Sequence, residues 1–171
     1  MMDFIIYGLP RSGTAWASAW LTTERTICWH DPLTYCAPEG LDKLESSKMY
    51  KGIADTFGWL LEDRPEKKLI LVRDPDEINA SLVKIGLDPL SDWLIRRFNE
   101  VPGKRVIWKD LWNNPEDIWH YLLPKVPFDE ERTEQLAKMR IVKADRPDSV
   151  PKLTHAMKLV ERMKHEQHAQ G

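Results

Sequence analysis

The sequence predicts an α/β fold in which a mainly parallel β-sheet is flanked by helices. The strand candidates are short, unbroken apolar runs such as KLILV at 68–72, which is typical of strands buried on both faces. Helical patterns separate these runs along the chain, as they do in parallel sheets. The 171 residues are enough for one domain with a core, and they contain no repeat or low-complexity segment. We therefore expect a single α/β domain over residues 1–171.

Five strands are expected, over residues 3–7, 26–30, 48–53, 68–72 and 105–108. The first is the apolar run FIIY, preceded by Asp3. The second, TICWH, ends where Asp31 and Pro32 interrupt it. Residues 33–48 are expected to be irregular, because Pro38 and Gly40 break regular structure there.

Helices are expected over residues 13–22, 54–62, 75–85, 89–100, 115–122, 129–139 and 150–164. The best marked begins after Asp74, an N-cap residue followed by Pro75 at the first helical position and by Glu77 three residues on. Gly86 ends it. Asn114 with Pro115 opens the helix over 115–122 in the same way. The helix over 150–164 is amphipathic and leads into a polar tail, and it could pack on its own domain or form a homodimer.

The overall charge gives no reason to expect a nucleic acid or a membrane as partner. The net charge is -2, and no apolar run approaches the roughly 18 residues of a membrane span. FIIYGL is too short for a signal peptide. The two cysteines, Cys28 and Cys36, fit reduced thiols inside the cell, so we expect a cytoplasmic protein.

The stretch GLPRSGTAW at 8–16 lies between the first strand and the first helix. Strand, glycine loop and helix together are the layout of loops that surround an anion with backbone N–H groups, as in P-loop nucleotide hydrolases. Those loops carry Lys and then Ser or Thr after the second glycine, where this chain has Thr14 and Ala15. The usual Mg²⁺ ligand is therefore missing. A sulfuryl group carries less charge than a terminal phosphoryl group, so it suits a site without metal; a glycine turn without a ligand is the alternative.

A second candidate loop is VRDPDEINASL, which places Arg73 at a strand end and Ser81 in the following helix. Ser81 lies seven positions after Asp74, a spacing that brings the serine back to the helix face near the cap. Arg73 and Ser81 could therefore hold one phosphate together. A strand–cap–helix junction without a ligand is the alternative.

Taken together, the two loops resemble those of sulfotransferases that use 3′-phosphoadenosine 5′-phosphosulfate (PAPS). The likeness covers roughly residues 3–140 and implies a P-loop-like fold. It implies that the first loop holds the 5′-phosphosulfate, with Arg11 at the transferring group and Trp16 near the adenine, while Arg73 and Ser81 hold the 3′-phosphate. The cofactor-binding residues implied are Pro10, Arg11, Ser12, Gly13, Thr14, Ala15, Trp16, Arg73 and Ser81.

This chain departs from the family pattern in two places. Ala15 stands where the family often has a hydroxyl residue that contacts the phosphosulfate. The family's C-terminal Arg-Lys-Gly phosphate loop is absent, and Lys143, Arg146 or Lys152 either substitutes for it or is a surface charge.

Transfer to a hydroxyl or amine needs a general base within hydrogen-bond reach of the acceptor. His30 ends a predicted strand and is the first candidate; Asp31 is the alternative, and Asp55 and Asp110 are further candidates. We expect catalytic roles for Arg11 and for His30 or Asp31, a small-molecule or carbohydrate acceptor, and no catalytic metal. Two rival hypotheses are a non-catalytic nucleotide-binding module and a small nucleotide kinase.

Overall fold

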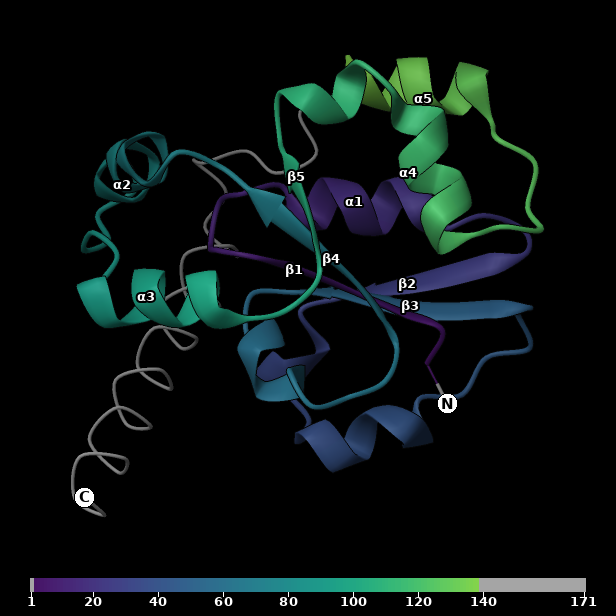
Figure 1. Ribbon diagram of the computed structural model, residues 1–171, viewed down its shortest axis with the longest axis horizontal. Helices are drawn as coiled ribbons and strands as arrows, with labels where there is room; N and C mark the ends of the chain where they lie inside the picture. The colour runs from purple at the N-terminus through teal and green to yellow at the C-terminus, as the bar shows by residue number, and fades with distance from the viewer. Residues whose placement is uncertain (1, 139–171) are drawn as a thin grey trace.

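The computed structural model describes residues 2–138 (Figure 1). The predicted helix over 150–164 and the candidate cations Lys143, Arg146 and Lys152 lie outside the described residues. The described chain is α/β and contains a five-stranded sheet, ordered β2-β3-β1-β4-β5, in which every neighbouring pair is parallel. The strands are β1 (Phe4–Gly8), β2 (Thr26–His30), β3 (Tyr50–Asp55), β4 (Lys67–Val72) and β5 (Lys104–Ile107).

Helices cover both faces of this sheet (Figure 1). They are α1 (Thr14–Leu21), α2 (Pro75–Val83), α3 (Asp92–Glu100), α4 (Pro115–Leu122) and α5 (Glu130–Ala137). Residues of α1 and α4 share one hydrophobic core with one face of the sheet, and α5 packs on α1. Residues of α2 and α3 form a second core with the opposite face. The fold class predicted from the sequence is thereby confirmed.

The central strand β1 explains why the strands are unbroken apolar runs. Phe4 and Ile6 belong to the core under α1, whereas Ile5 and Tyr7 belong to the core under α2 and α3. Successive side chains of a strand point to opposite faces, so a strand with a core on each face needs apolar residues at every position.

The prediction of a helix over residues 54–62 is wrong. Ala54 and Asp55 still belong to β3, where they lie opposite Ile6 and Tyr7 of β1. Beyond them only a short 3₁₀ helix, Gly58–Leu61, forms. The side chain of Asp55 accepts the N–H of Phe57 at 2.7 Å and so closes a turn where the helix was expected. The segment expected to be irregular holds two 3₁₀ helices, Pro32–Thr34 and Pro38–Lys43.

Within residues 2–138, no helix is both long and apolar enough to cross a membrane.

Candidate functional site

The loop between β1 and α1 lies at the carboxyl end of the central strand. It is a tight turn: Ser12 donates both its backbone N–H, at 3.0 Å, and its hydroxyl to the carbonyl oxygen of Leu9. Arg11 and Gly13 have positive φ angles of 70° and 101°. Among the side chains of residues 2–138, none caps the N-terminus of α1, whose first amide groups have no acceptor within the helix. The helix dipole and these amides favour an anion at this point.

Gly13 is required by its surroundings as well as by its backbone angle. A Cβ atom at this position would lie 2.5 Å from Cζ3 of Trp108. Trp108 follows β5 directly, and β5 lies beyond β4 in the sheet. The indole of Trp108 therefore packs against the loop from a strand that is not the neighbour of β1.

The structure brings the two predicted motifs into contact. Nη1 of Arg73 donates to the carbonyl oxygen of Arg11 at 2.8 Å, and Nε of Arg11 donates to the hydroxyl of Ser81 at 3.0 Å. Arg73 follows β4, the neighbour of β1, which explains why residues 62 positions apart meet. The two positive side chains and the Ser81 hydroxyl therefore lie together on one side of the loop.

Two further residues of this cluster were not predicted. The carboxylate of Glu77 lies 3.2 Å from Nε of Arg73 and 2.7 Å from Nζ of Lys109. Hydrogen bonds from Lys109 and Arg73 hold the pKa of Glu77 below its usual value, and Glu77 in turn raises the pKa of Lys109. The spacing of Arg73, Glu77 and Ser81 at four-residue intervals was the signal that could have found Glu77. Lys109 could have been found as a cation just after a strand end.

His30 and Asp31 lie on the other side of the loop, beyond β3. Nε2 of His30 is 3.3 Å from the hydroxyl of Thr14 and 3.1 Å from Oδ2 of Asp31. The side chain of His30 is 39% exposed and that of Asp31 is 23% exposed, so both reach solvent. Both candidate bases are thus next to the loop.

Asp55, the third candidate base, is fully buried. Its two carboxylate oxygens accept the backbone N–H groups of Leu33 and Phe57 at 2.8 and 2.7 Å. Burial raises the pKa of Asp55 to about 7, with a smaller contribution from the negative charge of Asp31. Asp55 therefore connects the loop after β2 to the turn after β3. This position supports the site from within the core. Asp110 lies on an exposed 3₁₀ turn, where Asn113 donates to it.

The remaining loop residues are buried or half-buried. Pro10, Ser12 and Thr14 are buried, and Ala15 is half-buried on α1. Trp16 is only 6% exposed, and its Nε1 donates to the carbonyl oxygen of Leu136 in α5 at 2.9 Å. Its indole therefore belongs mainly to the packing between α1 and α5.

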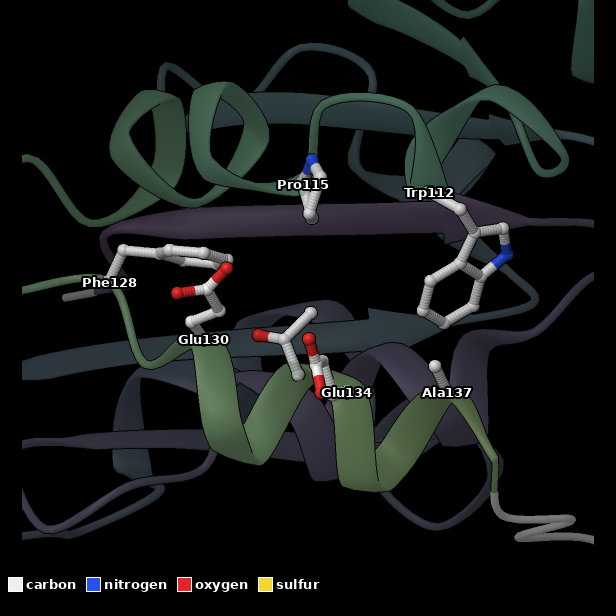
Figure 2. Close-up of a pocket in the computed structure, with 7 residues that line it drawn as sticks. Trp112, Pro115, Phe128, Glu130, Glu134 and Ala137 are labelled. Carbon is white, nitrogen blue, oxygen red and sulfur yellow. The ribbon is translucent and has the colours of Figure 1, made fainter.

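A groove lies between α5 and the segment that leads into α4 (Figure 2). It has a volume of about 580 Å³. Its lining residues are Trp112, Pro115, Phe128, Glu130, Thr133, Glu134 and Ala137. The ring of Trp112, which lines the groove, lies 4.6 Å from that of Trp16, centre to centre.

Among residues 2–138, no group of three or more His, Cys, Asp or Glu side chains is arranged to hold a metal ion. The chain matches no protein-family model and no curated protein.

Proposed function

We propose that this protein binds PAPS, and its product 3′,5′-adenosine bisphosphate (PAP), and transfers the sulfuryl group to a hydroxyl or amine of a small-molecule or carbohydrate acceptor. One observation carries the proposal. The loop of residues 8–16 and the Arg73–Ser81 motif meet through two hydrogen bonds at Arg11. The two motifs on which the likeness to PAPS-dependent sulfotransferases rests thus form one cluster.

The chemistry of the loop supports a donor of this kind. Amide groups at the start of α1 can hold the 5′-phosphate and stabilise the charge that it gains as the leaving group. Thr14 and Ala15 replace the Lys and Ser/Thr of a magnesium-dependent loop, which suits a group that needs no metal for its transfer.

His30 and Asp31 supply the base in this proposal. A neutral His30 can donate its Nε2–H to the carboxylate of Asp31, 3.1 Å away, so its other ring nitrogen can take the proton of the acceptor; Asp31 then stabilises the imidazolium. In the alternative, the carboxylate of Asp31 takes the proton of the acceptor, with His30 in the same contact beside it. Substituting His30→Gln and Asp31→Asn separately, with PAP binding retained, tells the two apart by their turnover. Near-native turnover in both variants would remove both residues from the reaction.

A comparison of thermal unfolding with PAP and with Mg·ATP tests the proposal. PAP at a hundred times its dissociation constant should add about 2.7 kcal/mol to the free energy of unfolding. For a protein of this size that raises the Tm by roughly 5–10 °C. Arg73→Gln should reduce this rise, and Arg96→Gln, which changes an exposed arginine of α3, should not.

The other outcomes each support a different function. A rise with Mg·ATP and none with PAP supports a nucleotide kinase. A rise with PAP but no sulfuryl transfer to any of a panel of hydroxyl and amine acceptors supports a non-catalytic binding module. No rise with PAP at millimolar concentration contradicts the proposal.

A further inference from the structure

We infer that Arg11 belongs to the phosphate subsite of Arg73 and Ser81, and that it makes the site selective for nucleotides with a 3′-phosphate. The inference rests on the proposed function. It differs from the expectation drawn from the resemblance, in which Arg11 acts at the transferring sulfuryl group.

The side chain of Arg11 reaches α2. Its Nε donates to the hydroxyl of Ser81 in the second turn of α2. Since Nε is bonded to the guanidinium carbon, the positive charge of Arg11 lies beside α2. The left-handed backbone of Arg11, with a φ angle of 70°, is a conformation that non-glycine residues rarely adopt.

The main chain of Arg11 is bound to the same motif, Arg73–Ser81. Nη1 of Arg73 donates to the carbonyl oxygen of Arg11. Side chain and backbone of one residue are therefore bound to Ser81 and Arg73, the two residues proposed to hold the 3′-phosphate. Two bonds to one unit hold Arg11 in place better than either bond would alone.

The hydrogen-bond donors of Arg11, Arg73 and Ser81 suit a phosphate monoester. Arg11 and Arg73 are planar guanidinium groups, which match the geometry of phosphate oxygens. The hydroxyl of Ser81 accepts from Arg11, and its own proton can be donated to a ligand oxygen. Two guanidinium groups and one hydroxyl can each reach one of the three terminal oxygens of a 3′-phosphate.

The charges around the cluster favour a dianion. Arg11, Arg73 and Lys109 contribute three positive charges. Glu77, held between Arg73 and Lys109, offsets one of them, and Asp74 acts on Lys109 from a greater distance. Among the described residues of this cluster, the positive side chains outnumber the negative ones.

Calorimetric binding of PAP and of 5′-AMP tests the inference, because these two ligands differ only in the 3′-phosphate. In Arg11→Gln we expect the affinity for PAP to fall about 10- to 100-fold, as for the loss of a charge-assisted hydrogen bond. The affinity for 5′-AMP should change less than about threefold. Arg96→Gln is the matched control and should leave both affinities unchanged.

The outcomes separate this inference from the proposed function. Equal weakening of PAP and 5′-AMP would assign Arg11 to the 5′ end and overturn the inference while leaving the function intact. An unchanged PAP affinity would overturn it as well. If the unaltered protein does not bind PAP, the proposed function fails and the inference falls with it. Should Arg11→Gln not fold, Arg11→Lys replaces it, with a smaller loss that is again confined to PAP.

Discussion

At the scale of single residues, Asp55 has the most unusual environment near the site. It is fully buried at the end of β3, accepts two backbone N–H groups, and lies close enough to Asp31 for the two negative charges to interact. Oδ1 of Asp31 also accepts the N–H of Thr56 at 3.1 Å. The two carboxylates therefore hold adjacent loops at the point where β2 ends in His30 and Asp31 follows.

The pKa of about 7 predicts how Asp55 affects stability as pH changes. The pKa is higher in the folded protein than in the unfolded chain, so folding favours the protonated carboxyl. Its contribution is fully present below about pH 4 and is lost as pH rises to about 7, by on the order of a few kcal/mol. In Asp55→Asn this loss should disappear. Urea unfolding at pH 5 and pH 8 measures it, and an equal pH dependence in the two proteins would contradict the assignment.

Some site residues could be predicted from the sequence because their signals are local. Arg73 is placed by a strand end and Ser81 by helical periodicity, and topology explains why the two meet Arg11. The buried state of Asp55 and the position of Lys109 beside Glu77 depend on contacts between distant segments. No local pattern encodes those contacts.

At the scale of elements, α5 holds α1, the helix that begins at the candidate site. The guanidinium of Arg132 donates to the carbonyl oxygens of Ala19, Trp20 and Thr22 at the C-terminal end of α1, at 2.6, 3.3 and 2.7 Å. The hydroxyl of Thr133 accepts from Nε1 of Trp20 at 2.9 Å. A positive charge at the C-terminal end of a helix is favourable, because the last carbonyl groups of a helix accept no hydrogen bond from the helix itself.

Arg132→Met should therefore lower the free energy of unfolding by about 1.5–3 kcal/mol, because it removes hydrogen bonds from a charged donor while keeping most of the side-chain volume. Lys138→Met is the matched control on the exposed end of α5, where the amino group lies 3.9 Å from Glu134 and the expected change is within about 0.5 kcal/mol. Urea denaturation of both variants gives the comparison. Equal losses would mean that Arg132 does not hold α1.

Element prediction succeeded where local signals and tertiary contacts agree. Asp74 caps α2 by accepting the N–H of Asp76, and α2 begins at Pro75 as predicted. The helix expected over 54–62 was wrong because pairing with β1 extends β3 through Asp55. The groove beside α5 depends on the packing of α5 against other segments, and helical periodicity does not determine that packing.

At the scale of the whole molecule, the sheet separates two groups of tryptophans. On the face covered by α1, the rings of Trp16, Trp20, Trp108, Trp112 and Trp119 form a chain of contacts with centroids 4.6–5.6 Å apart. On the opposite face, Trp59 and Trp93 form a separate pair at 5.4 Å. The group under α1 is connected to the candidate site, because the ring of Trp108 lies against Gly13.

Ligand binding at the loop should therefore change the fluorescence of the tryptophan group on the α1 face only. We expect PAP to change the intrinsic emission in a saturable way, because an anion at residues 9–15 alters the field at Trp108, whose indole packs on Gly13. Trp108→Phe should remove most of this change, whereas Trp93→Phe should keep it, since Trp93 packs on Trp59 on the opposite face of the sheet. A titration of the three proteins measures the effect. Loss of the response in Trp93→Phe with retention in Trp108→Phe would place the ligand on the opposite face, away from the loop that joins β1 to α1.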